Sequence, residues 1–270
     1  FYLPLSLSGF TYGQSSTREI ADSALPAIVV IETDVGTGSG VILDASGVIA
    51  TNFHVIETAG AISVNLSTGD QYDDVSVIDF DIVKDIAILK IKGFDLPFVT
   101  MGNSNSVGVG DDVIVMGAPE GYEQSVTRGI VSAVREMDEG YRLIQTDAAI
   151  SSGSSGGGMF NLSGELVGIS VAYIKDAQNI NFVIPINYYR GMFGTSAKYS
   201  LEEFLEITAS ETGPRSAGTA ASSMQTLEEF MNAINSELDL GFQKTEDSET
   251  WFLAEDGIVV FVNEIDDVLL

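Results

Sequence analysis

The stretch 145–161 reads QTDAAISSGSSGGGMFN, with the pentad GSSGG at 153–157. An acyl-transfer enzyme needs a serine flanked by glycines, because the backbone must approach the substrate carbonyl and direct N–H groups at the developing oxyanion. A flexible Gly/Ser linker has a similar composition. This stretch, however, lies between LIQTDAAI and LVGISVAYI, two apolar segments with the pattern of buried strands. Ser155 is therefore the predicted nucleophile.

A nucleophilic serine needs a general base, and the chain has one histidine, His54, within VIATNFHVI. Taken singly, such a histidine is more often a satisfied core residue than a general base. The base also needs an orienting acid, for which the sequence offers Asp70, Asp73, Asp74, Asp79, Asp81 and Asp85. Asp85 is favoured because it immediately precedes the apolar segment IAILKI, whereas the others lie in turns or on polar faces.

The composition is that of an acidic globular protein. The 270 residues include 39 Asp and Glu against 12 Lys and Arg, a net charge of −27, and 45% are hydrophobic. A surface of this sign repels phosphate backbones and anionic lipid heads, so nucleic-acid partners are disfavoured. Salt relieves the self-repulsion of such a surface, which suits a saline or extracytoplasmic setting. The localisation we expect is periplasmic or secreted.

Cofactor and metal sites are not predicted. The chain contains no cysteine, which excludes disulfides and thiolate chemistry, and a single histidine makes a catalytic transition metal improbable. The segment GTGSG at 36–40 superficially suggests a phosphate-binding loop. It lacks the following lysine and helix, so a glycine-containing hairpin is preferred.

The fold expected from the pattern is all-β. Short, β-branched segments bounded by turns form one series over about residues 24–95, which includes AIVVIE, AISVNL and DIAILKI. After the stretch GFDLPFVTMGNSNSVGVGD, a second series over about 105–188 includes VIVMG, YRLIQTD and NFVIPI. The sequence predicts two small barrels, with His54 and Asp85 in the first and Ser155 in the second.

Residues 191–270 have a different character. The segments SLEEFLEI at 200–207 and TLEEFMNAINSEL at 226–238 predict amphipathic helices, and ETWFLAED and GIVVFVNEIDDVLL predict strands. This part holds 16 of the 39 acidic residues and 3 of the 12 basic ones. We expect a separable acidic α/β extension of unknown role.

The N-terminal segment 1–23 opens with FYLPLSLSGFTYG, whose apolar run is too short to span a bilayer. Two interpretations stay open: a signal-peptide remnant, or an aromatic segment that packs protomers together. No other segment has the length of a transmembrane helix, so no integral membrane segment is predicted.

Five blocks resemble, in this order, the signature blocks of the HtrA/Deg family of trypsin-like serine endopeptidases: TNFHVI, DIVKDIAILKI, TRGIVSAV, QTDAAISSGSSGG and NFVIP. The resemblance covers about residues 24–186. It implies a chymotrypsin-like double β-barrel at 24–190, with His54 as general base, Asp85 as its orienting acid and Ser155 as nucleophile. The N–H groups of Gly153 and Ser155 would form the oxyanion hole.

The resemblance has departures. Ser154 stands where the family usually has Asn, and Gly158 where Pro or Ala is common, although neither change removes a catalytic atom. No PDZ carboxylate-binding loop is recognised in residues 191–270. The resemblance also implies a homotrimer, packed through the N-terminal aromatic residues.

The substrate pocket of this architecture is expected just before the nucleophile and on the strand after it, which here places Ala149, Ile150, Tyr173 and Ile174 in it. These residues carry no carboxylate, so small or medium aliphatic P1 side chains are expected. The interpretation is a cofactor-independent serine endopeptidase acting on unfolded or misfolded polypeptides in protein quality control. The alternatives are an inactive binding protein on the same fold and an esterase with the same triad.

Overall fold

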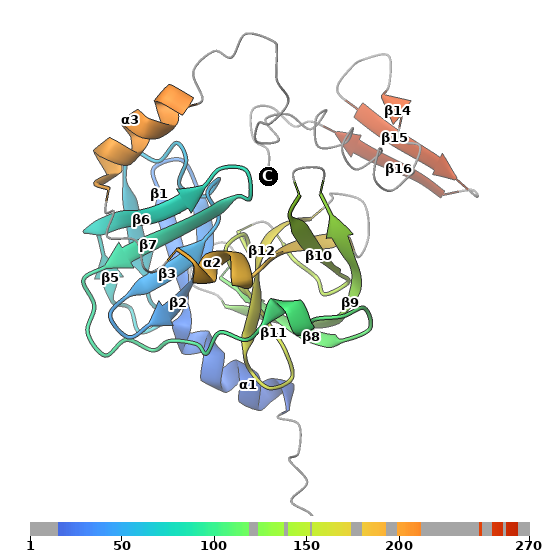
Figure 1. The fold of residues 1–270 in the computed structure, drawn as a ribbon, viewed down its shortest axis with the longest axis horizontal. Helices are drawn as coiled ribbons and strands as arrows, with labels where there is room; N and C mark the ends of the chain where they lie inside the picture. Colours follow the sequence, from blue (N-terminus) through green and yellow to red (C-terminus); the bar gives the residue numbers. More distant parts are fainter. Residues whose placement is uncertain are drawn as a thin grey trace, which may run out of the picture.

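The computed structural model describes residues 16–118, 124–137, 140–151, 153–173, 180–192 and 199–211, and the strands at 243–244, 250–255 and 258–263. The N-terminal aromatic segment and the predicted helix at 226–238 lie outside the described residues. Figure 1 shows two β-structures, each formed by one half of the central part of the chain.

The described chain begins with helix α1 (Thr17–Ala24). Ser16 and Glu19 form a capping box: the Glu19 N–H donates to the Ser16 hydroxyl, and the Ser16 N–H donates to the Glu19 carboxylate at 2.8 Å. This satisfies N–H groups that the first helical turn leaves unpaired. The apolar side of α1 packs into the hydrophobic core through residues that include Ile20 and Ala24.

The first half forms a seven-stranded antiparallel sheet in the order β5-β4-β1-β2-β3-β7-β6. Its strands are β1 (Ile28–Thr33), β2 (Thr37–Asp44), β3 (Val48–Thr51), β4 (Ile62–Asn65), β5 (Gln71–Tyr72), β6 (Val75–Asp81) and β7 (Ile86–Ile91). Strands β2, β3 and β7 are buried along most of their length, which matches the apolar sequences of β3 and β7 and the apolar second half of β2. No closing strand pair is found among the described residues, so this half is a curved sheet rather than a hydrogen-bonded closed barrel.

The second half is a closed barrel in the order β10-β13-β12-β11-β8-β9. Its strands are β8 (Asp112–Gly117), β9 (Ser125–Glu136), β10 (Arg142–Thr146), β11 (Gly158–Phe160), β12 (Leu166–Tyr173) and β13 (Asn181–Pro185). The predicted chymotrypsin-like all-β fold is confirmed. The sequence pattern missed only short strands, β5 and β11 here and β14 in the extension, because two or three residues carry no readable periodicity.

The two halves share a continuous hydrophobic core. One cluster of buried side chains includes Ile31 and Leu89 of the first half and Phe160 and Ile184 of the second. The Gln124 side-chain amide adds polar links, since it donates to the carbonyls of Leu25 at 2.7 Å and Ile28 at 2.9 Å. The relative placement of the halves therefore rests on both apolar and polar contacts.

Two helices follow the barrel, α2 (Asn187–Arg190) and α3 (Leu201–Glu211). Just before α3, Tyr199 pairs with Val77 of β6 through two backbone hydrogen bonds of 2.8 and 3.1 Å. Phe204 of α3 is fully buried, with its ring centroid 5.1 Å from that of Phe80 and 5.9 Å from that of Phe53. Figure 1 shows α3 lying against the first sheet.

This packing corrects the predicted boundary at residue 190. Residues 199–211 belong to the core of the first sheet, although their acidic composition resembles that of the rest of the extension. The composition misled because the exposed acids of α3 dominate its sequence, whereas the buried face depends on few residues. A cut after residue 189 would remove Phe204 and expose the rings of Phe53 and Phe80.

The predicted strands of the extension are present as β15 (Thr250–Glu255) and β16 (Ile258–Asn263), with β14 (Gln243–Lys244) added to form a three-stranded antiparallel sheet. Within the described part of the chain, no helix has the length and apolar character needed to cross a membrane.

The packing of α3 predicts that Phe204→Ala destabilises the protein by about 3–5 kcal/mol, because it removes a buried ring and leaves a cavity between two aromatic neighbours. Urea unfolding followed by circular dichroism measures this. Glu206→Ala, at an exposed position of the same helix, is the matched control and should change stability by less than about 0.5 kcal/mol. Equal unfolding midpoints for the two variants would show that α3 does not pack as described.

Candidate active site

His54 and Asp85 meet at the end of the first sheet. His54 lies three residues after β3, and Asp85 ends the turn between β6 and β7. The Asp85 carboxylate accepts from the backbone N–H of His54 at 2.9 Å, and its other oxygen lies 2.7 Å from His54 Nδ1. This two-point contact fixes both the position of the backbone and the direction of the ring, and it favours a proton on Nδ1.

Asp85 has a left-handed backbone conformation, with φ of 56°. Asp tolerates this region better than most residues, yet the conformation costs free energy and persists only when neighbours hold it. Here the side-chain amide of Asn52 donates to the Asp85 carbonyl at 3.2 Å, while the carboxylate is held by His54. The unusual turn therefore directs the carboxylate at the imidazole.

A further buried side chain, that of Tyr189, hydrogen-bonds to the end of β3, just before His54. The Tyr189 hydroxyl of α2 donates to the Thr51 carbonyl at 3.2 Å, and Tyr189 is fully buried. Burial, together with the charge of nearby Asp85, raises the pKa of Tyr189 well above 10.0, so the hydroxyl stays a neutral donor. The last residue of β3 is thus fixed just before the chain turns towards His54.

The electrostatic surroundings of His54 favour its protonated form. Burial lowers the pKa of the imidazole, but the charge and hydrogen bond of Asp85 and the charge of Glu57 outweigh this, so the pKa is raised above 6.5. The pKa of Glu57 is also raised. Burial is the main cause and the charge of Asp85 adds to the increase, whereas the charge of His54 reduces it. The side chain of His54 remains 40% exposed, so these charges are partly screened by solvent.

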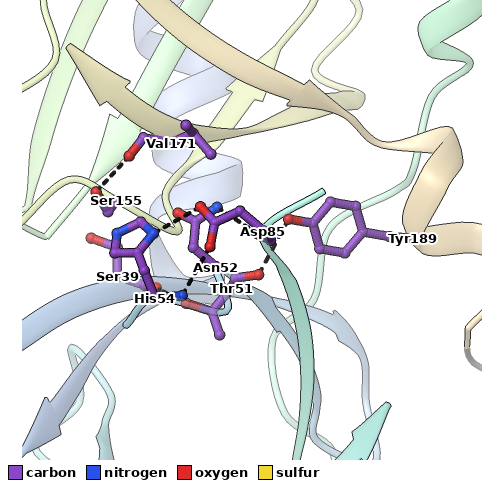
Figure 2. A network of polar contacts seen from close by, with 8 residues as sticks. All are labelled: Ser39, Thr51, Asn52, His54, Asp85, Ser155, Val171 and Tyr189. Carbon is purple, nitrogen blue, oxygen red and sulfur yellow. Dashed lines mark hydrogen bonds and ion pairs between the residues drawn. The ribbon is translucent and has the colours of Figure 1, made fainter. Parts of the chain in front are cut away.

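Ser155 lies on the loop between β10 and β11 of the second half. Its hydroxyl donates to the carbonyl of Val171 on β12 at 2.8 Å. Figure 2 draws the imidazole of His54 between Ser155 and Asp85. The hydroxyl must turn from Val171 to the imidazole before it can transfer a proton, and such hydrogen bonds often form only with bound substrate.

The glycines of the pentad are required by space and by backbone conformation. Gly153 and Gly156 have φ of 81° and 86°, in the region that glycine adopts readily. A Cβ on Gly156 would overlap the Ser39 carbonyl oxygen, and one on Gly157 would overlap the Met116 carbonyl oxygen. These contacts exclude the linker interpretation, because the loop is packed tightly against strands of both halves.

Within the pentad 153–157, two N–H groups have no acceptor among the described residues. The N–H of Ser154 donates to the Ser151 carbonyl at 2.9 Å, and that of Gly156 donates to the Ser170 carbonyl at 2.8 Å. Among the described residues, the N–H groups of Gly153 and Ser155 donate to no acceptor. Unpaired N–H groups beside a serine hydroxyl are the donors that an oxyanion hole requires.

The residues expected to form the substrate pocket have different surroundings. Ile150 is buried in the core cluster of the second barrel, and the Ala149 carbonyl accepts from the Thr127 hydroxyl at 2.8 Å. Tyr173 is the last residue of β12, and Ile174 lies outside the described residues. Their proposed role in substrate binding stays a prediction.

Some residues around the site could not be found from the sequence alone. Ser39, Asn52, Ser170 and Tyr189 are all buried and hydrogen-bond to the segments that carry the predicted triad. The signal for them was at most a polar residue beside apolar ones, and that signal does not name a partner. Among the described residues, no group of three or more His, Cys, Asp or Glu side chains could hold a metal ion.

Comparison with known proteins gives consistent matches. The trypsin-like peptidase domain matches residues 38–169. The serine endoprotease DegS of Haemophilus influenzae is 34% identical over 224 residues, which cover 74% of this chain and 65% of that protein. The DegP-like periplasmic serine endoprotease of Buchnera aphidicola is 48% identical over 159 residues, covering 56% of this chain and 34% of that protein.

Structural comparison gives the same result. The crystal structure of Deg5 matches with a TM-score of 0.56 and 34% identity, and the match covers 64% of this chain and 89% of that one. The chain spans about two fifths of the length of its curated relatives HhoB and HhoA of Synechocystis, 38% and 43% respectively. With the fold and the arrangement of His54, Asp85 and Ser155, these matches lead to one conclusion: the chain belongs to the HtrA/Deg family of trypsin-like serine endopeptidases.

Proposed function

We propose that the protein is an endopeptidase that hydrolyses peptide bonds through an acyl-enzyme, with Ser155 as nucleophile, His54 as general base and Asp85 as orienting acid. The observation that carries this proposal is the two-point contact of Asp85 with His54, with Nδ1 at 2.7 Å and the backbone N–H at 2.9 Å. It holds the imidazole in the tautomer whose Nε2 accepts a proton. Hydrolysis also requires stabilisation of the oxyanion. The N–H groups of Gly153 and Ser155, which have no acceptor among the described residues, are the proposed donors for it.

The reaction would proceed in two steps. Ser155 Oγ attacks the scissile carbonyl carbon while its proton passes to His54 Nε2, and the carbonyl oxygen becomes an oxyanion bound by the N–H groups of Gly153 and Ser155. The tetrahedral intermediate collapses, and the imidazolium protonates the departing amine. A water molecule then attacks the ester in the same way, which releases the acid and restores the Ser155 hydroxyl.

Unfolded or misfolded polypeptides are the proposed substrates, in an extracytoplasmic role in protein quality control. The name of the Buchnera relative, a periplasmic serine endoprotease, supports the location. The net charge of −27 fits a compartment in which salt screens it. A homotrimer packed through residues 1–15 is proposed on the family resemblance alone, since these residues lie outside the described part of the chain.

The triad proposal predicts that Ser155→Ala and His54→Ala lose casein hydrolysis and that Asp85→Asn lowers kcat by about 10⁴, because the imidazole then favours the wrong tautomer. A fluorophosphonate probe followed by peptide mapping should label Ser155. Ser163→Ala, at an exposed turn position, is the control and should retain wild-type rates.

Near-wild-type hydrolysis by Ser155→Ala would contradict the proposal. Probe labelling without peptide hydrolysis, but with ester turnover, would favour the esterase alternative. No labelling and no hydrolysis by the wild-type chain would favour an inactive binding protein.

The raised pKa of His54 predicts the acid limb of the pH profile. His54 must be neutral to act as base, so kcat/KM should fall as the pH decreases through a midpoint above 6.5. Glu57→Gln removes a negative charge that stabilises the imidazolium, so the midpoint should move to lower pH. Asp22→Asn, at an exposed acid on α1, removes the same charge away from the site and should leave the midpoint unchanged. A midpoint that does not move in Glu57→Gln would contradict this electrostatic account.

The predicted specificity is for small or medium aliphatic P1 residues. It is supported by the position of Asp147, the nearest upstream carboxylate, which accepts from the Ile130 N–H at 2.6 Å and lies against Gly129. One oxygen of this carboxylate is bound to the backbone of β9, and Asp147 lies too far upstream of Ser155 to form the floor of the pocket. Mass spectrometry of a casein digest should therefore find cleavage mainly after Val, Ala, Ile or Thr. A majority of cleavages after Lys or Arg would show that the pocket is elsewhere.

A further inference from the structure

The segment GTGSG at 36–40 has a structural role that the proposed reaction does not yet include. It leads from the β1–β2 turn into β2, and its serine, Ser39, is fully buried at the contact between the two halves of the protein. The Ser39 hydroxyl donates to the Gly153 carbonyl at 2.8 Å and accepts from the Ala118 N–H at 2.9 Å. The Ser39 N–H donates to the Ser155 carbonyl at 2.7 Å.

The glycine before Ser39 permits this close approach. A Cβ on Gly38 would lie 2.7 Å from Val55 Cγ1 and 3.4 Å from the Ser155 carbonyl oxygen. Gly38 therefore stands between the residue that follows His54 and the residue proposed as nucleophile. The glycine-containing segment brings both within reach of one strand, which a larger side chain would prevent.

A second buried hydroxyl, that of Ser170, also hydrogen-bonds to the loop that carries Ser155. Ser170 of β12 is fully buried and donates to the Ser154 carbonyl at 2.6 Å and the Gly157 carbonyl at 3.2 Å. The N–H of Gly157 also donates to the Ser154 carbonyl at 2.9 Å. The Ser154 carbonyl, which shares a peptide plane with the Ser155 N–H, thus accepts from two donors.

Peptide geometry connects these carbonyls to the oxyanion hole. In a planar trans peptide the N–H points opposite to the C=O, so a fixed Ser154 carbonyl fixes the direction of the Ser155 N–H. The Gly153 carbonyl belongs to the plane that carries the Ser154 N–H, which donates to the Ser151 carbonyl at 2.9 Å, so holding this carbonyl fixes the backbone between the two proposed donors. Gly153 has no Cβ to limit rotation about its φ and ψ angles, so this restraint comes from a residue outside the loop.

We propose that Ser39 and Ser170 are positioning residues for the oxyanion hole: two buried hydroxyls, one from each half of the protein, hold the Gly153 and Ser154 carbonyls and so fix the backbone that joins the Gly153 and Ser155 N–H groups. The inference rests on the proposed serine-peptidase function and deepens it. Neither hydroxyl contacts the reacting atoms. The two hydroxyls should therefore stabilise the transition state more than the bound substrate, because the oxyanion exists only in the transition state and the adjoining intermediates.

The test uses Ser39→Ala and Ser170→Ala in the full chain, with steady-state hydrolysis of a peptide substrate and inhibition by a peptide aldehyde of the same sequence. Loss of a whole oxyanion donor lowers kcat by about 10²–10³, so loss of its positioning should lower kcat by about 10–100-fold with KM changed less than about threefold. Affinity for the aldehyde, whose adduct places an oxygen in the oxyanion hole, should weaken in parallel with kcat/KM.

Controls separate this role from a general loss of structure. Ser104→Ala removes another buried hydroxyl, which accepts from the Asn187 N–H at 3.2 Å away from the nucleophile loop, and should keep wild-type kcat and aldehyde affinity. Ser170→Thr retains the hydroxyl on a side chain suited to a strand and should recover most of the activity. If Ser39→Ala does not fold, the Ser170 variants decide the matter.

Unchanged kcat and aldehyde affinity in both alanine variants would overturn the positioning role while leaving the proposed function intact. So would a parallel loss in Ser104→Ala, since the effect would then follow from any buried hydroxyl. Failure of the proposed function gives a different result: either Ser155→Ala hydrolyses the peptide as the wild-type chain does, or the wild-type chain does not hydrolyse it.

Discussion

The hydrogen bonds between β2 and the nucleophile loop are the interaction on which the candidate site depends. Ser39 contacts the loop through its N–H and its hydroxyl, and its carbonyl accepts from the Thr51 hydroxyl at 2.8 Å. One buried residue thus connects the strand that leads to His54 with the loop that carries Ser155. An unpaired buried polar group costs about 1–3 kcal/mol, so breaking this contact would leave a costly unpaired group both on β2 and on the loop.

The two halves contribute different physical properties to the site. The first supplies the His54–Asp85 pair at a partly exposed edge, where 40% of the His54 side chain is open to solvent. The second supplies a loop of glycines and serines whose backbone is fixed by buried hydroxyls. Proton transfer requires a titratable group near water, and oxyanion binding requires donors that do not reorganise. The two requirements are met separately: the first half provides the group for proton transfer, and the second half provides the donors for the oxyanion.

The fold and the three triad candidates could be predicted from the sequence because their signals are local. Short, β-branched segments bounded by turns define the strands, and GSSGG, the single histidine and an aspartate before an apolar strand limit the choice of residues. The boundary at residue 190 was wrong for residues 199–211, since composition reports exposed acids and not the single buried ring of Phe204. The interaction of Asn52 with Asp85 also escaped prediction, because it depends on how β3 and the β6–β7 turn pack together.

By itself, the sequence determined the strand pattern, the separation into two halves and the residue types available for chemistry. Only the tertiary structure decided which groups hold that chemistry in place: Ser39 and Gly153 are 114 residues apart in the chain and 2.8 Å apart between hydroxyl and carbonyl oxygen. Tyr189 reaches Thr51 across 138 residues in the same way. Periodicity records whether a residue faces the core, but not which partner it meets there, because that partner is set by the packing of whole strands against one another.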